Sequence, residues 1–353
     1  MSDLVAVIMA GGVGTRFWPM STPERPKQFL ALVGDRTLLQ ESYDRVVELT
    51  GPDRILVVTG QRYQSLVAEQ LPRLQPSHIL GEPFRRDTAA AVALAALVGR
   101  KLFGNPILAV LTADHWIRPV PQFHRALLSA ARQARERDAI YTFGIRPRRP
   151  AVSYGYVEMG PAVFEDEGLS HHRLLGFHEK PDLKTAVGYV DSGRHCWNSG
   201  MFVFSADRIL RALQRHLPAH LELLAPAVDA FGTAGWKQAL RHAFEAMAPI
   251  SIDYGVMEKA EEIWSVVAEF DWSDLGGWLA LESFLPQRGG NRVHGRTAVL
   301  SAEENLVFCE DPEELVALLG VQDLIVVRSW GRTLVARRDR IEELKKLVED
   351  LCP

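Results

Sequence analysis

The amino-acid sequence predicts an α/β protein with a mixed sheet covered by helices on both faces, followed by a small β-rich C-terminal domain. Over the first 145 residues, short apolar runs rich in β-branched residues alternate with longer segments of helical periodicity. Strands that are apolar throughout are typical of a parallel sheet with both faces buried. After residue 287 the helical segments give way to short β-patterned runs, and this change predicts the second domain.

The elements of the first part follow one another in a regular order. Each predicted strand is a short apolar run, and each predicted helix carries apolar residues three or four positions apart. Strands are predicted over residues 4–9, 54–59, 78–80, 107–111 and 139–144. Helices are predicted over residues 37–49, 63–71, 87–104 and 122–137.

The alternation changes after residue 152, which indicates a mixed continuation of the same sheet. Strands are predicted over 154–159, 174–178 and 200–204, and helices over 182–192 and up to residue 247. A glycine-rich polar segment over 287–292 marks a boundary, so we expect domains of residues 1–287 and 288–353. The second domain is predicted to hold strands at 296–300, 305–309, 323–328 and 332–336 and a final helix at 339–351.

Composition excludes several classes of protein. Of the 353 residues, 47% are hydrophobic and 24% are charged, which is ordinary for a globular chain and argues against a disordered or collagen-like one. A net charge of −4 argues against a dedicated nucleic-acid-binding protein. Cys196, Cys309 and Cys352 are too few and too far apart for a disulfide scaffold. No apolar stretch is long enough for a membrane span, so we expect a cytoplasmic protein with neither a nucleic-acid nor a membrane partner.

A glycine-rich segment directly follows the first predicted strand. Backbone N–H groups at such glycines can approach a phosphate closely, and the Arg16 and Lys27 side chains can bind phosphate oxygens. The segment is neither a Walker A loop nor a dinucleotide fingerprint, because it lacks their remaining residues. A tight turn with a surface arginine and lysine is the alternative. If the segment binds phosphate, it is a nucleotide-binding loop that includes Ala10, Gly11, Gly12, Gly14 and Thr15.

Two aspartates are candidate metal ligands. Asp114 follows a predicted strand, where acidic side chains face the ligand crevice of a parallel sheet, and Asp274 lies in a segment with two glycines. Mg²⁺ takes few protein carboxylates and keeps water or phosphate oxygens as its other ligands. Asp271 is the local alternative to Asp274, and both aspartates could instead be ordinary loop residues. We expect His115 to be structural or to face a phosphate rather than to bind the metal.

The glycine-rich segment resembles the opening motif of sugar-1-phosphate nucleotidylyltransferases. Trp18 and the Pro-Lys-Gln-Phe segment at 26–29 are similar to the motif of the mannose-1-phosphate guanylyltransferases among them. The resemblance covers nearly the whole chain and implies a Rossmann-like fold of the nucleotide-diphospho-sugar transferase type. It also implies that Asp114 and Asp274 are the metal positions, with Mg²⁺ or another divalent cation as cofactor.

Further segments resemble the sugar pocket of that family. The resemblance implies sugar-phosphate binding by residues of the Tyr-Gly-Tyr, Glu-Lys-Pro, Asn-Ser-Gly and Ile-Asp-Tyr segments. These residues are Gly155, Glu179, Lys180, Asn198 and Asp253. Each segment has a plainer alternative, such as a helix entry, a strand entry or packing. The family usually has an aliphatic residue where His178 stands, and we expect this side chain to face away from the pocket.

The segment over 82–88 resembles the base-binding loop of the family. An asparagine commonly precedes the threonine there, whereas Asp87 stands in this sequence. Asp87 could accept hydrogen bonds from guanine or could cap the following helix. We favour the cap and expect Glu82, Arg86 and Thr88 to contact the base.

The resemblance implies the transfer of GMP from GTP to α-D-mannose 1-phosphate, which gives GDP-mannose and pyrophosphate. Arg16, Lys27, Asp114, Lys180 and Asp274 are the predicted catalytic residues. A homodimer is expected. We expect no phosphomannose isomerase activity, because only about 65 residues follow Arg288 and the isomerase domain of related bifunctional enzymes is larger. The alternatives are a nucleotidylyltransferase for glucose 1-phosphate or another NTP, and a regulatory protein that binds nucleotide sugars without catalysis.

Overall fold

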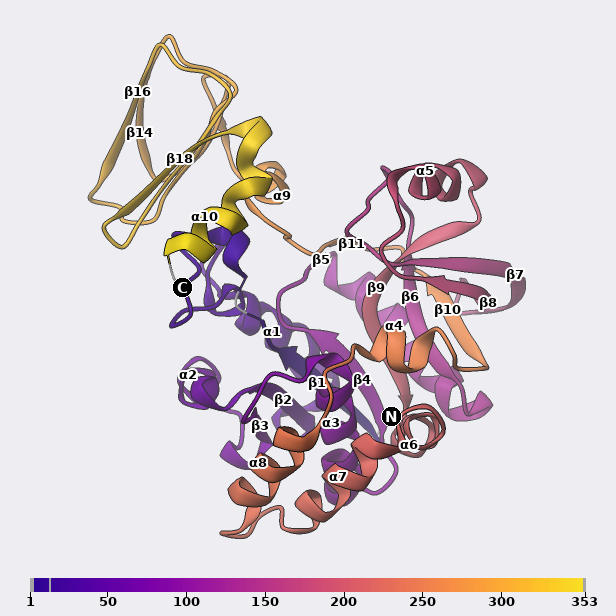
Figure 1. Ribbon diagram of the computed structural model, residues 1–353. Coiled ribbons are helices and arrows are strands. Elements are labelled where there is room, and N and C mark those ends of the chain that lie inside the picture. Colours follow the sequence, from indigo (N-terminus) through magenta and orange to yellow (C-terminus); the bar gives the residue numbers. More distant parts are fainter. Residues whose placement is uncertain (1–2, 13, 352–353) are drawn as a thin grey trace. The chain divides into compact units, whose positions relative to one another are not determined.

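The computed structural model describes residues 3–12 and 14–351, which form two compact units (Figure 1). Unit 1 comprises the chain up to Ala10, Ser42–Ala113 and Ile117–Trp272. Unit 2 comprises Gly11–Glu41, Asp114–Trp116 and the chain from Ser273 onward. The glycine-rich segment therefore packs with the C-terminal part of the chain, although the first strand belongs to unit 1.

Over the described residues, unit 1 forms a nine-stranded sheet. The strands β1 to β4 are mutually parallel, whereas β9 is antiparallel to both β4 and β6. This arrangement confirms the predicted mixed sheet. In spatial order the strands are β3 (Ile79–Glu82), β2 (Ile55–Gly60), β1 (Leu4–Ala10), β4 (Ile107–Thr112), β9 (His195–Ser205), β6 (Ile140–Ile145), β10 (Ile263–Val267), β8 (Leu169–His178) and β7 (Tyr156–Asp166).

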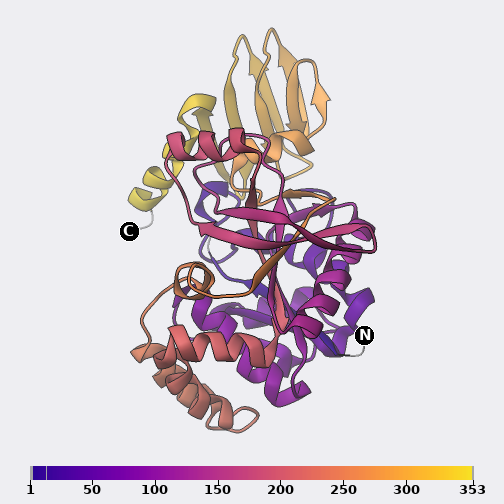
Figure 2. The same cartoon turned by 90° about the vertical axis from the view of Figure 1, so that its right-hand side faces the viewer.

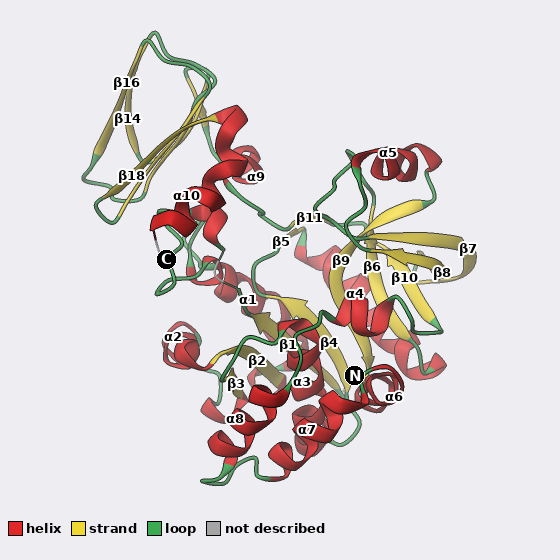
Figure 3. Cartoon of the chain, in the orientation of Figure 1, coloured by secondary structure: helices red, strands yellow, loops and turns green. Residues whose placement is uncertain are grey.

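The helices of unit 1 cover both faces of the sheet (Figure 3). The alanine-rich α3 (Asp87–Phe103) packs against α6 (Ala206–His216) and α7 (Pro218–Asp229), and these helices share one core with side chains of β1, β2 and β4. Ile140 of β6 faces that core, while Phe143 on the opposite face of β6 contacts Phe123 of α4. The remaining helices are α1 (Leu38–Thr50), α2 (Gln64–Gln70), α4 (Val120–Arg137), α5 (Leu183–Ser192) and α8 (Trp236–Ala246).

Several strands were not predicted or were predicted too short. β7 and β8 are longer than the two predicted strands and form a hairpin. The chain turns between them at Glu167 and Gly168, whose φ angles are +52° and +76°. β10 was missed because a five-residue strand carries little periodic signal by itself. It forms between β6 and β8, where it pairs with both neighbours. Short strands at β5 (Trp116–Arg118) and β11 (Asp271–Ser273) were missed for the same reason.

Unit 2 contains the predicted β-rich part. One sheet has the order β12-β13-β15-β17-β18 and a second pairs β14 with β16, and most neighbours are parallel. Figure 2 shows these strands side by side, in orange to yellow. The predicted final helix begins instead as a 3-10 turn over Arg338–Glu343 and continues as α10 (Leu344–Leu351). The strands are β12 (Gln287–Arg288), β13 (Asn291–His294), β14 (Arg296–Leu300), β15 (Leu306–Cys309), β16 (Leu315–Leu319), β17 (Leu324–Ser329) and β18 (Arg332–Arg337).

The core of unit 2 joins the start of the chain to its end. Phe17, from the glycine-rich segment, lies edge-on against Trp278 with ring centroids 5.2 Å apart, and Trp278 also contacts Phe308 of β15. The indole Nε1 of Trp278 donates a hydrogen bond of 3.1 Å to the backbone oxygen of Trp18. These contacts hold the glycine-rich segment on the C-terminal strands. In the part of the chain that the structure describes, no helix is both long and apolar enough to cross a membrane.

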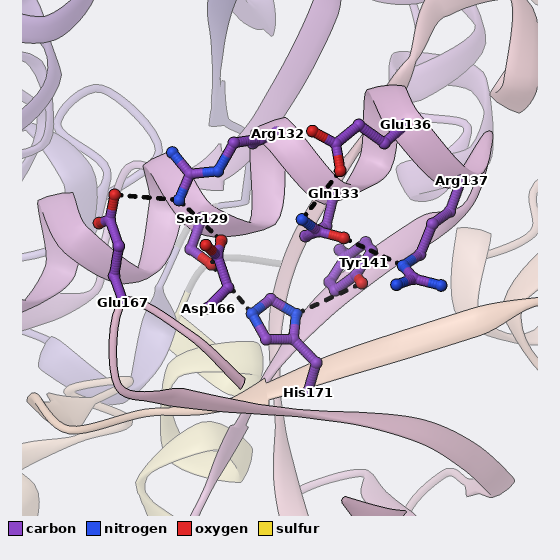
Figure 4. Close-up of polar contacts among 9 residues, drawn as sticks. All are labelled: Ser129, Arg132, Gln133, Glu136, Arg137, Tyr141, Asp166, Glu167 and His171. Carbon is purple, nitrogen blue, oxygen red and sulfur yellow. Dashed lines mark hydrogen bonds and ion pairs between the residues drawn. The ribbon is translucent and has the colours of Figure 1, made fainter. Parts of the chain in front are cut away.

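A polar network lies buried in unit 1 (Figure 4). The hydroxyl of Ser129 lies 2.6 Å from a carboxylate oxygen of Asp166 and 2.9 Å from Nε2 of His171. Nδ1 of His171 lies 3.3 Å from the hydroxyl of Tyr141, and Arg132 forms an ion pair with Asp166. Burial lowers the pKa of His171 to about 4 despite the opposing effect of Asp166. The imidazole is therefore neutral at pH 7 and has a structural role.

His171 is expected to make stability depend on pH. Because the pKa of histidine in an unfolded chain is about 6.5, the unfolded state gains a proton as the pH falls from 6.5 to 4, while the folded state does not. The folded state therefore loses stability across this window, and His171→Gln should lack that loss. Urea unfolding at several pH values compares the two proteins, with the exposed His242→Gln as the matched control. Parallel curves for wild type and His171→Gln would contradict the assignment.

Candidate functional site

The predicted site residues gather in three places, which we name by their residues. Unit 2 holds the Lys27 cluster, which contains Arg16, Lys27, Asp114 and Asp274. Unit 1 holds the Asn198 cluster, which contains Gly155, Glu179, Lys180, Asn198 and Asp253. The third place is the β3–α3 segment of unit 1, which contains Glu82, Arg86 and Thr88.

Lys27 is the centre of its cluster. It begins a 3-10 turn over Lys27–Phe29 and is buried, with 8% of its side chain exposed. Nζ donates hydrogen bonds of 2.9 Å to Oδ2 of Asp114 and 2.5 Å to the backbone oxygen of Asp274. It also lies 5.8 Å from the ring centroid of Phe17. A buried ammonium group requires such partners, because an unpaired charge is costly in the interior.

Gly14 explains why the glycine-rich segment fits against Lys27. Gly14 has a φ of +71°, and a Cβ atom there would lie 2.4 Å from Cβ of Lys27. Any side chain at this position would displace the lysine or the loop. The segment therefore needs glycine at position 14 for packing as well as for backbone conformation. Val13, which the sequence motif includes, lies outside the described residues.

Asp114 is held in its ionised form. Burial acts to raise the pKa of the carboxyl group, but the Lys27 ammonium and then His115 outweigh it, so the pKa is lowered. His115 itself is buried. Only Oδ2 of Asp114 receives the Lys27 hydrogen bond, and 37% of the side chain is exposed. An ionised, partly exposed carboxylate fits a hard divalent cation such as Mg²⁺.

Asp274 and Arg16 meet around a glycine. A Cβ atom on Gly276 would lie 2.8 Å from Oδ2 of Asp274 and 3.4 Å from Nη1 of Arg16. The glycine therefore leaves room for a carboxylate and a guanidinium group side by side. A second carboxylate in the cluster fits the oxygen ligands that Mg²⁺ prefers. The Arg16 guanidinium can bind the phosphate groups of a ligand, and the Asp274 carboxylate can bind a metal ion that accompanies them.

The structure separates Asp271 from Asp274. Asp271 belongs to unit 1, begins the short strand β11 and forms an ion pair with Arg148. Asp274 follows the end of that strand and belongs to unit 2. Asp271 therefore has a surface partner of its own.

The Asn198 cluster is tightly hydrogen-bonded. Nδ2 of Asn198 donates to Oδ1 of Asp253 at 3.1 Å, and Oδ1 of Asn198 accepts from Thr142 at 3.3 Å. Its backbone N–H donates to the oxygen of Gly155 at 2.8 Å. A Cβ atom on Gly155 would lie 2.3 Å from Oε2 of Glu179, so the glycine makes room for this carboxylate. Sequence reasoning missed Thr142, because a threonine inside a predicted strand gives no signal of its own.

Acidic groups crowd one end of this cluster. Burial, reinforced by the neighbouring Glu179 carboxylate, raises the pKa of Asp253 to about 6. Lys180 Nζ lies 3.1 Å from Oε1 of Glu179, and this contact outweighs burial and raises the pKa of the lysine. Lys180 has a φ of +47°, a left-handed conformation that is uncommon outside glycine. Such backbone strain is typical of functional sites.

The β3–α3 segment contains an unpaired carboxyl group. Oε1 of Glu82, at the end of β3, is buried and has no hydrogen-bond partner among the residues that the structure describes. Burial raises the pKa of Glu82 to about 8, against the opposing effect of Arg85. Buried polar groups normally have partners, so this oxygen is a candidate acceptor for a ligand.

Other residues of the segment already have protein partners. Arg86 donates to the backbone oxygens of Phe244 and Glu245 at 2.6 and 3.0 Å, and the Thr88 hydroxyl accepts from the Ile252 N–H at 2.8 Å. α3 begins at Asp87, whose carboxylate accepts from the N–H of Thr88 at 2.8 Å.

Two backbone oxygens of the glycine-rich segment are also occupied. The oxygen of Ala10 accepts from the hydroxyl of Thr59 at 2.9 Å, and that of Gly12 accepts from Nε2 of Gln28 at 3.3 Å. These two bonds tie the backbone of the segment to β2 and to the Lys27–Phe29 turn. Gly11 is exposed, and Thr15 begins a 3-10 turn over Thr15–Phe17.

The chain is similar to known proteins along most of its length. Residues 5–287 match the nucleotidyl transferase family, and residues 295–351 match a mannose phosphate isomerase/GMP-like β-helix domain. The chain is 40% identical to a mannose-1-phosphate guanylyltransferase of Escherichia coli, over 99% of this chain and 74% of that protein. It is 39% identical to a protein of the same name from Klebsiella pneumoniae, with the same coverage.

A solved structure is similar over its full length. The protein, from Thermus thermophilus, is described as a mannose-1-phosphate geranyltransferase. It is 33% identical, with a TM-score of 0.86 and 99% of both chains covered. The fold, the family match over most of the chain and the relatives that match 99% of it agree. The chain therefore belongs to the nucleotidyl transferase family.

Proposed function

We propose that this protein transfers the guanylyl group of GTP to α-D-mannose 1-phosphate and releases GDP-mannose and pyrophosphate. The observation that carries the proposal is the Lys27 cluster. Its buried ammonium group donates to the Asp114 carboxylate and to the backbone oxygen of Asp274, and the Asp274 carboxylate and the Arg16 guanidinium both lie beside Gly276. Such a set fits a triphosphate bound with a divalent cation. The names of relatives that match 99% of this chain support the choice of nucleotide and sugar.

The reaction is a single displacement at phosphorus. An oxygen of the sugar phosphate attacks the α-phosphorus of GTP, and the bond from that phosphorus to the oxygen shared with the β-phosphate breaks. The second pKa of a phosphate monoester is about 6, so near pH 7 the nucleophile is mostly a dianion. It needs no general base, and catalysis consists of positioning the substrates and neutralising charge.

Arg16 and Lys27 bind the triphosphate in this proposal and stabilise the pyrophosphate as it leaves. Glycine N–H groups at Gly11, Gly12 and Gly14 add hydrogen bonds to phosphate oxygens. Asp114 and Asp274 would hold a divalent cation, which we propose to be Mg²⁺ and which supplies further positive charge when bound. Lys27 keeps Asp114 ionised and oriented, so the carboxylate is ready for the cation without a proton being removed first.

The Asn198 cluster binds the sugar phosphate in this proposal. Glu179, Asn198 and Asp253 offer acceptors and an amide donor for sugar hydroxyls, and Lys180 holds the phosphate. Gly155 leaves the space in which the Glu179 carboxylate lies. Glu82 accepts hydrogen bonds from the guanine N–H groups, while Arg86 and Thr88 shape the base site through their protein contacts.

We also propose a homodimer that forms through the β-rich part of unit 2. Several apolar side chains of its strands are more than half exposed, and such surfaces often mark association sites. They are Leu300, Leu315, Leu319 and Val335. The division into residues 1–287 and 288–353 and the cytoplasmic location stay predictions.

One assay tests the proposed function. Pyrophosphate release is measured with Mg²⁺ for each combination of four NTPs with mannose 1-phosphate and glucose 1-phosphate. We expect GTP with mannose 1-phosphate to be turned over faster than every other combination. A preference for another pair would replace the proposed substrates, and no release from any pair would favour a binding protein without catalytic activity.

Asp114→Asn and Asp274→Asn are each expected to lower turnover at least about 100-fold, as removal of one preorganised charged contact does elsewhere. Both should also need more Mg²⁺ to reach half of their maximal rate, because a neutral amide is a weaker ligand. Asp271→Asn is the matched control, since its ion pair with Arg148 lies on the surface. Thermal unfolding separates loss of function from loss of fold. An unchanged Mg²⁺ requirement in both variants would contradict the metal assignment.

Lys180→Ala is expected to weaken mannose 1-phosphate binding about 10- to 100-fold, because a hydrogen bond to a charged group contributes about 1.5–3 kcal/mol. GTP binding should stay unchanged. Calorimetric titration with each ligand separates the two effects. Lys184→Ala, at a nearby exposed lysine of α5, is the control. Equal weakening for both ligands in Lys180→Ala would show that Lys180 does not belong to the sugar-phosphate site.

Glu82 is expected to make GTP binding depend on pH. In the free protein the carboxyl group keeps its proton up to about pH 8, whereas the ionised form is the stronger acceptor for guanine N–H groups. GTP affinity should therefore rise with pH up to about 8 and then level off. Glu82→Gln should bind GTP more weakly and lack this rise. Binding curves measured between pH 6.5 and 9 that run parallel for the two proteins would refute the role.

A further inference from the structure

Two histidines and a glutamate form a cluster in unit 1 that the proposed reaction does not use. They are Glu158 of β7, His178 of β8 and His195 of β9. One ligand atom from each residue lies within 4.8 Å of those of the other two. Within residues 3–12 and 14–351, no other group of three such side chains comes as close together.

The sheet brings the three side chains to one face. Glu158 lies directly opposite Gly176 of β8 and opposite His195 of β9. Directly paired residues point to the same face of a sheet, and His178, two positions after Gly176, points there too. A Cβ atom on Gly176 would lie 2.7 Å from Nε2 of His178. The imidazole therefore lies over the glycine, beside the strand position of Glu158.

The hydrogen bonds of His195 leave one ring nitrogen available as a ligand. Its Nδ1 lies 3.0 Å from the hydroxyl of Ser192. That hydroxyl also lies 2.8 Å from the backbone oxygen of Tyr189, to which it can donate its single proton while it accepts from Nδ1 of His195. Nε2 then carries the lone pair. Histidines that bind metals usually donate their second ring N–H in this way, which fixes the tautomer.

Neighbouring side chains orient the two imidazoles. Tyr189 of α5 stacks on both rings, with centroids 4.0 Å from His195 and 5.2 Å from His178. Arg194 contacts Glu158 at 3.6 Å, but its side chain is 68% exposed, so this weak surface pair can give way to a ligand.

We propose that Glu158, His178 and His195 form a zinc site. Two imidazoles and one carboxylate are the ligand types that Zn²⁺ favours, and three protein ligands leave a fourth position for water. Mg²⁺ prefers oxygen ligands alone, so the site differs in kind from the paired carboxylates of the Lys27 cluster. A bound ion joins β7, β8 and β9 beneath α5, and it therefore stabilises this part of unit 1.

The test is a titration of the metal-free protein with Zn²⁺ by calorimetry, without nucleotide and with millimolar Mg²⁺ present to occupy carboxylate sites. We expect one Zn²⁺ per chain and a thermal midpoint that rises when Zn²⁺ is added. His178→Ala and His195→Ala should each weaken binding at least about 100-fold, since loss even of outer partners costs ~10–100-fold. His172→Ala, on the same strand but outside the cluster, should bind Zn²⁺ as the wild type does.

Glu158→Gln keeps the test decisive if a histidine variant fails to fold, because the amide preserves the shape of the carboxylate but is a poorer ligand. It too should bind Zn²⁺ more weakly, with an unchanged circular dichroism spectrum. Zn²⁺ bound equally well by wild type and by the folded variants would overturn the proposal. Absence of Zn²⁺ binding to the wild type would overturn it as well. Neither result bears on pyrophosphate release, which tests the proposed function separately.

Discussion

The pairing of the buried Lys27 ammonium group is the interaction that holds the Lys27 cluster of unit 2 together. A lysine in the interior is tolerated only when its charge is paired and its protons are donated. Nζ meets this requirement through Asp114 and the backbone oxygen of Asp274, which lie 87 and 247 positions away in the sequence. Three distant segments must therefore come together before the lysine can be buried. The same contacts then fix the positions at which charge is available to a ligand.

Carboxyl groups in the two units are tuned in opposite directions by their neighbours. In unit 2, burial acts to raise the pKa of Asp114, but the neighbouring Lys27 ammonium group outweighs it and keeps that carboxyl group ionised. In unit 1, burial and the neighbouring Glu179 raise the pKa of Asp253, while burial raises that of Glu82. An ionised carboxylate suits a divalent cation, whereas the proposed partners of Asp253 and Glu82 are neutral donors, namely sugar hydroxyls and a base. These surroundings underlie the proposal that unit 2 binds the metal ion and unit 1 binds the sugar and the base.

Packing in unit 2 links the two ends of the chain. Phe17 of the glycine-rich segment shares a core with Trp278 and with Phe308 of the C-terminal strands. The β-rich part therefore does more than extend the chain, since it supports the loop that carries Arg16 and Lys27. A boundary near residue 287 describes where the sequence pattern changes. The compact units instead follow the packing, which assigns Gly11–Glu41 to the same unit as the C-terminal residues.

Local sequence was sufficient to predict the mixed α/β architecture, the strands β1, β2 and β4 and the helix α3. These depend on periodicity and on short motifs, which neighbouring residues are enough to specify. Contacts between distant segments set the rest. β10 forms only because β6 and β8 supply hydrogen bonds on both sides. The separation of Asp271 from Asp274, the unpaired Glu82 oxygen and the grouping of His178 with Glu158 and His195 all depend on partners distant in sequence. Periodicity indicates which face a side chain takes, but the identity of its neighbours is set by how strands and loops pair across the whole chain.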